Sequence, residues 1–143
     1  MFSHTTQMET KTSDKIVEIL RWVVFLPGAA LGAGVAWILI NTLGRFSLGF
    51  VGIEPDTFLA QFYFNTAGHA AMGAAFVYVG AKIVPSNQKI VAYILAGLGL
   101  VLGGFALFPA IMVGSGWAIW GSICVVNGIG AMVYLINRGE TDI

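Results

Sequence analysis

The sequence has little charge and almost no cysteine. Only 10% of its 143 residues are charged, seven Lys and Arg balance seven Asp and Glu, and Cys124 is the one cysteine. A soluble domain usually carries about 25% charged residues. One cysteine excludes a disulfide framework and a cysteine-rich zinc site. Balanced charge also argues against nucleic-acid binding. The composition therefore excludes an ordinary cytosolic enzyme, a disordered segment and a nucleic-acid partner.

Apolar residues make up 57% of the chain. A soluble fold of this size could not bury so much apolar surface, because surface is large relative to volume in small chains. A helix that crosses a bilayer needs about 20 mostly apolar residues, and four stretches meet this length: 22–40, 58–83, 90–113 and 117–136. We therefore expect an all-α integral membrane protein, with residues 1–143 forming a single domain of four transmembrane helices in an up-down bundle.

The segments between the apolar runs differ in length. Residues 114–116 and 85–89 are short turns, so the helices that they join must be antiparallel neighbours. The segment 41–57 is longer than such a turn needs, and it is partly apolar. We expect this loop to lie along the membrane surface or to fold back on the helix ends. Residues 1–15 and 137–143 are expected to be polar tails. The first apolar run is too long for a cleaved signal peptide.

The basic residues indicate an orientation, because positive residues near short loops collect on the cytoplasmic side. With four spans, one side of the membrane holds six of the seven Lys and Arg residues, and the other side holds only Arg45. The six are Lys11, Lys15, Arg21, Lys82, Lys89 and Arg138. Both termini are therefore expected in the cytoplasm, and the location is expected to be a bacterial-type cell inner membrane.

Glycine is frequent, at 19 positions. Helices in lipid associate by close backbone approach at small residues. Gly28 and Gly32 form one G-x-x-x-G motif, and Gly99 and Gly103 form another. We expect these glycines to be helix-packing surfaces, within the chain as the favoured interpretation, or toward another chain. The partners expected are the lipid bilayer and either further copies of the chain or another membrane protein.

Polar side chains lie along one face of the second apolar run. Gln61, Asn65 and His69 are spaced i, i+4 and i+8, which aligns them on a helix. Thr66 lies beside them, and Ser122 and Asn127 in the fourth run are expected to be their partners. Two interpretations stay open: hydrogen bonds between helices, or a polar lining for an ion, proton or small solute, in which His69 changes charge near neutral pH.

Residues that carry chemistry are scarce. A haem held between helices usually needs two histidines within the membrane, and only His69 qualifies. No cluster of Cys, His, Asp and Glu residues predicts a metal site. Ser115 and Ser122 have no base at useful spacing, so we expect neither an enzyme nor a cofactor. The leading interpretation is a small structural or accessory subunit that packs through Gly/Ala-rich helix faces. The alternative is a homo-oligomeric channel or facilitator lined by the second helix.

Overall fold

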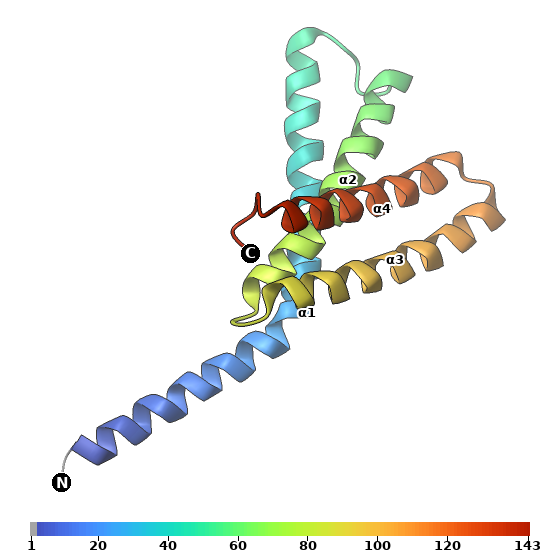
Figure 1. The fold of residues 1–143 in the computed structure, drawn as a ribbon. Coiled ribbons are helices and arrows are strands. Elements are labelled where there is room, and N and C mark those ends of the chain that lie inside the picture. The colour runs from blue at the N-terminus through green and yellow to red at the C-terminus, as the bar shows by residue number, and fades with distance from the viewer. Residues whose placement is uncertain (1–2) are drawn as a thin grey trace.

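The chain forms four helices and, over the residues described, no strand. The computed structural model describes residues 3–143, with the backbone alone for residues 3–12. The helices are α1 (Ser3–Val51), α2 (Phe58–Ile83), α3 (Gln88–Val113) and α4 (Gly116–Arg138), as Figure 1 shows. The predicted all-α class is confirmed.

Three of these helices are long and apolar enough to cross a bilayer. The candidate spans are Ser13–Val51 in α1, Gln88–Val113 in α3 and Gly116–Arg138 in α4. This composition is that of a membrane protein. Helix α2 is the exception, because its apolar residues are interrupted by the polar side chains of its N-terminal half.

Helix α1 is much longer than the sequence suggested. The expected tail is helical from Ser3. The expected loop over 41–57 is wrong for residues 41–51, because α1 continues to Val51, and the connection to α2 is confined to residues 52–57. Gly44 and Gly49 do not interrupt the helix. It ends at Gly52, whose φ of 75° suits glycine. The Gly52 N–H donates to Gly49 O (3.2 Å) and the Ile53 N–H donates to Leu48 O (3.1 Å), which is the Schellman pattern.

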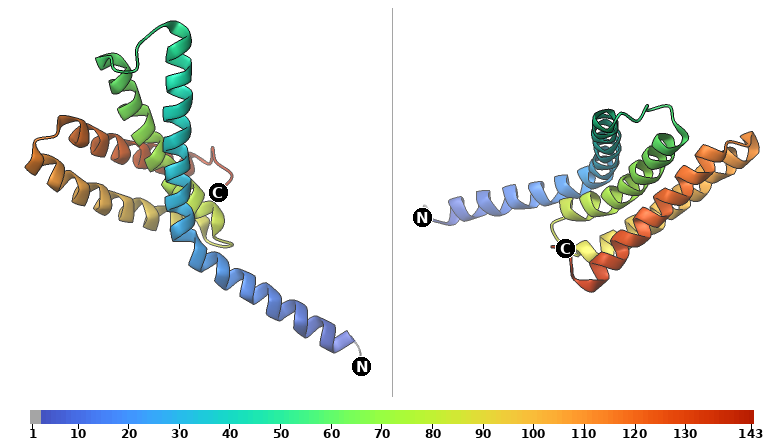
Figure 2. Two further views of the ribbon diagram at one scale, coloured as in Figure 1. Left: turned by 180° about the vertical axis from the view of Figure 1, so that it is seen from behind. Right: turned by 90° about the horizontal axis from the view of Figure 1, so that it is seen from above.

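Helix α1 changes direction along its length. Pro27 lies inside it, and a proline removes one backbone hydrogen bond and crowds the preceding turn, which bends a helix. The part of α1 on the N-terminal side of this bend projects away from the other helices (Figures 1 and 2). Phe25 is near the start of the packed part, since it contacts the core cluster of Val84, Val91 and Leu95.

Helix α2 is the centre of the fold. It packs against α1, α3 and α4, whereas the backbone of α1 approaches neither that of α3 nor that of α4 within the described chain. The α1–α2 hairpin and the α3–α4 hairpin cross one another (Figure 2). The arrangement is therefore more open than the expected up-down bundle. From Phe64 to Ala81, every residue of α2 is buried or half-buried.

The core lies near the turn between α2 and α3. Val77 and Ala81 of α2 form a cluster with residues of the other hairpin: Ala92, Ala96, Ile129 and Ile136. The Lys82 ammonium at the end of α2 donates to the Asp142 backbone oxygen (2.6 Å). The C-terminal residues and the α2–α3 turn therefore lie at the same end of the molecule.

Candidate functional site

The polar stripe of α2 is satisfied largely by its own helix. Asn65 Nδ2 donates to the Gln61 carbonyl (2.9 Å). His69 Nδ1 lies 2.8 Å from the Asn65 carbonyl; a carbonyl only accepts, so Nδ1 carries the proton in this contact. In the neutral ring, Nε2 is then an acceptor. This nitrogen faces Gly121 of α4, where an added Cβ would lie 2.9 Å from it.

Thr66 makes a direct polar link between α2 and α4. Its hydroxyl oxygen accepts from Trp120 Nε1 (2.9 Å). Two aromatic pairs accompany this bond: Phe58 with Trp117 and Phe62 with Trp120, at centroid distances of 5.6 and 5.4 Å. The sequence interpretation put Thr66 in the polar set but missed its partner. The usable signal was Trp120 itself, because an indole N–H away from water needs an acceptor.

The two polar residues of α4 do not join the stripe. Ser122 donates to the Ala118 carbonyl (2.9 Å) and Asn127 Nδ2 donates to the Ile123 carbonyl (3.1 Å), both within α4. Ser122 is half-buried, but Asn127 is exposed. Contrary to expectation, Asn127 is therefore not a partner of Gln61 or Asn65.

The four glycines of the G-x-x-x-G motifs all lie at contacts within the chain. Gly28 meets Ile83 and Gly32 meets Val79, where an added Cβ would lie 2.9 Å from the Val79 Cβ. A Cβ on Gly99 would lie 2.7 Å from Ile129 Cδ1. Gly103 has more room, with Val126 at 3.4 Å. The first motif therefore packs α1 on α2, and the second packs α3 on α4.

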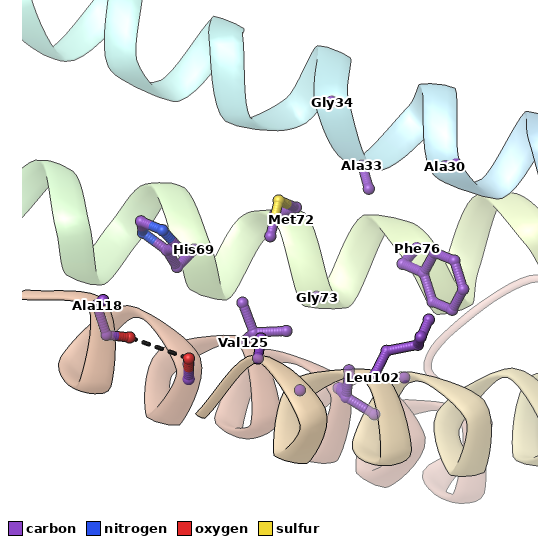
Figure 3. Close-up of a pocket in the computed structure, with 15 residues that line it drawn as sticks. Ala30, Ala33, Gly34, His69, Met72, Gly73, Phe76, Leu102, Ala118 and Val125 are labelled. Atoms are coloured by element: carbon purple, nitrogen blue, oxygen red, sulfur yellow. Dashed lines mark hydrogen bonds between the residues drawn. The ribbon is translucent and has the colours of Figure 1, made fainter. Parts of the chain in front are cut away.

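An apolar groove separates α1 from the α3–α4 hairpin. It has a volume of about 590 Å³. Helix α2 forms its floor with His69, Met72, Gly73 and Phe76, while α1 lies on one side and the other hairpin on the opposite side (Figure 3). Seven small residues contribute to the two walls: Ala30, Ala33 and Gly34 from α1, Gly99, Gly103 and Ala106 from α3, and Ala118 from α4.

Polar groups are few along this groove. His69 and Ser122 are its polar side chains, and the Ser122 hydroxyl is already bonded within α4. Among the described residues, no three His, Cys, Asp or Glu side chains are grouped so as to hold a metal ion. The groove is thus suited to an apolar occupant. Sequence reasoning missed it, since it depends on how the two hairpins are placed and not on a motif.

Comparison of the chain with protein-family models, curated proteins and solved structures gives no match.

Proposed function

We propose that the protein is an accessory subunit of a membrane assembly, and that its groove receives a transmembrane helix of a larger partner. The observation that carries this proposal is the set of small residues on both walls of the groove. In lipid, helices associate where small side chains let backbones approach closely. Ten of the 19 glycines would bring an added Cβ within 4 Å of a neighbouring heavy atom, whereas Gly34 lines the groove with no heavy atom within that distance.

The proposal includes four membrane crossings, with α2 as the fourth. Helix α2 lies along α1 over most of its length, from Gly28 beside Ile83 to Gly44 beside Phe64. A helix paired in this way sits at the same depth as the apolar part of α1. The polar side chains of α2 are tolerable there because polar groups within a membrane are placed toward protein and not toward lipid.

We propose a bacterial-type inner membrane with both termini in the cytoplasm. Four crossings put the N-terminus, the α2–α3 turn and the C-terminus on one side, which then holds all the Lys and Arg residues except Arg45. The contact between Lys82 and Asp142 supports this grouping of the turn with the C-terminal residues.

The alternative of a channel lined by α2 gains less support. Asn65 and His69 bond to carbonyls of their own helix, and Thr66 bonds to Trp120. These side chains are half-buried within the chain's own packing. The geometry fits hydrogen bonding that holds helices in place better than it fits a solute path.

Filling the groove tests the proposed function. Gly34→Leu places a side chain into the groove, whereas Gly97→Leu places the same side chain on α3 away from the groove; neither glycine has a heavy atom within 4 Å of an added Cβ. Both proteins are purified in mild detergent, and the proteins that co-purify with wild type are identified and quantified. Gly34→Leu is expected to lose its partner while Gly97→Leu retains it.

Equal retention by the two variants overturns the groove as the docking site. A wild-type protein that purifies without any stoichiometric partner overturns the accessory role. Helical content and thermal unfolding of the variants in the same detergent show whether either substitution disturbs the fold.

A further inference from the structure

The outward side of α4 carries a polar residue where lipid would be expected. Asn127 lies midway along α4 (Gly116–Arg138) and is exposed. Three further exposed residues follow the same side of the helix with spacings of four and three: Ile123, Gly130 and Tyr134. Such alternating spacing is that of a helix seam that packs against a second helix. We call these four residues the α4 seam.

Asn127 has unused hydrogen-bonding capacity. An Asn side chain has two N–H donors and one carbonyl acceptor. One N–H is used by the Ile123 carbonyl at 3.1 Å. The second N–H and Oδ1 have no partner among the described residues. A polar group left unpaired in hydrocarbon is costly, so an α4 that crosses the bilayer gains free energy when this face is covered by a polar partner.

We propose that the α4 seam pairs with the same seam of a second copy of the chain. The free N–H of one Asn127 complements the free Oδ1 of the other, and a two-fold axis makes this exchange reciprocal. Two copies inserted in the same orientation present parallel α4 helices, which brings the two Asn127 residues to the same depth. The proposal rests on the proposed membrane crossing of α4, but it does not require the groove to be occupied.

Gly130 allows the close approach that the pairing needs. It lies on the seam three residues after Asn127, and an added Cβ there would meet no heavy atom within 4 Å. The α4 residues that line the groove lie on another side of the helix: Ala118, Ser122, Val125 and Ile129. A second copy on the seam therefore leaves the groove open for its own partner.

The first test measures self-association in bilayers. Donor-labelled and acceptor-labelled copies of the full chain are diluted into lipid vesicles, and energy transfer is followed against protein density. Asn127→Leu is expected to weaken dimerisation by roughly tenfold, the size of a good polar contact between membrane helices. Asn127→Gln keeps both kinds of hydrogen-bonding group and is expected to dimerise more strongly than Asn127→Leu. Unchanged transfer in Asn127→Leu overturns the proposal.

Cysteine cross-linking supplies a second test that does not depend on affinity. Gly130→Cys is expected to form an oxidised dimer, because both copies present residue 130 at the seam. Gly97→Cys is the matched control, since Gly97 is equally open but lies on α3. The native Cys124 is buried and present in both variants. Dimers through residue 97 alone, or absence of dimers through residue 130, overturn the proposal.

The outcomes are separable from those of the proposed function. If Gly34→Leu loses a co-purifying partner while energy transfer is absent, the accessory role stands and the α4 seam does not. If energy transfer depends on Asn127 but no partner is found, the seam stands and the accessory role does not.

Discussion

Gly73 of α2 and Gly128 of α4 each face the backbone of the other's helix. A Cβ on Gly73 would lie 3.1 Å from the carbonyl carbon of Val125, and one on Gly128 would lie 2.8 Å from the carbonyl carbon of Ala70. The carbonyl oxygens of the same residues are closer still. The two helices therefore cross with their backbones in contact, and side chains other than hydrogen are excluded from both positions.

This crossing predicts that alanine at either glycine destabilises the fold. Gly73→Ala and Gly128→Ala are expected to lower the free energy of unfolding by about 1–3 kcal/mol, because a backbone cannot yield as the end of a flexible side chain can. Unfolding in mixed micelles, followed by circular dichroism, measures the change. Gly97→Ala is the control and is expected to leave stability unchanged or raise it by up to about 1 kcal/mol, through helix propensity. Equal effects at all three positions would contradict the close crossing.

The Thr66–Trp120 hydrogen bond predicts a measurable coupling between α2 and α4. Thr66→Val and Trp120→Phe each remove one partner of the 2.9 Å bond. Each is expected to destabilise the protein, and a double-mutant cycle is expected to give a coupling energy of about 0.5–1.5 kcal/mol. Strict additivity of the two substitutions would show that the bond contributes nothing to stability.

His69 and Asn65 are predicted to act in folding. His69→Ala removes a ring packed against Gly121 and is expected to cost about 1–2 kcal/mol of unfolding free energy. Asn65→Leu removes the amide that bonds to Gln61 and is expected to lower stability by a smaller amount. Asn65 is not among the residues that line the groove, so co-purification of the partner by folded Asn65→Leu is expected to persist. Loss of solute passage in either variant, at wild-type stability, would instead assign the substituted side chain to a solute path.

The proposed four-crossing topology predicts which turns are accessible from which side. Thr57→Cys, just before α2, is expected to react with an impermeant thiol reagent from outside the cell, and Ser86→Cys, between α2 and α3, only from the cytoplasmic side. A cytoplasm-dependent reporter fused after Ile143 is expected to be active. Labelling of both cysteines from one side would show that α2 does not cross, and the termini would then lie on opposite sides.

The sequence predicted the helices better than it predicted their ends. The positions of α3 and α4 follow from their apolar runs, because turn residues lie at the ends of these runs. Asn87 and Gly114 are two of these turn residues, and both have a positive φ. The end of α1 was misplaced because polar residues and glycines between 41 and 51 resemble a loop. What stops the helix is the hydrogen-bonded turn at Gly52, and a pattern of residue types does not locate such a turn among several glycines.

The sequence predicts which face of a helix packs better than it predicts which residues meet between two helices. The G-x-x-x-G motifs were read as packing surfaces, but the sequence does not say that Gly32 meets Val79 or that Gly99 meets Ile129. Asn127 was assigned to the interior because polar residues in membrane helices usually face protein. Its actual place depends on the rotation of α4, which is set by buried contacts at Gly121, Cys124 and Gly128. That rotation follows from the packing of α4 against the other helices and not from the sequence of α4 alone.

The sheltered position of α2 has a consequence for biogenesis. Its side chains between Phe64 and Ala81 are buried or half-buried among the three other helices. In the proposed four-crossing topology, the polar residues of α2 disfavour its transfer into lipid as a single helix. Entry as a preformed hairpin with α1 would remove this barrier, since only six residues, 52–57, connect the two. Helix α2 would then pack on α1 during synthesis, before α3 and α4 are made.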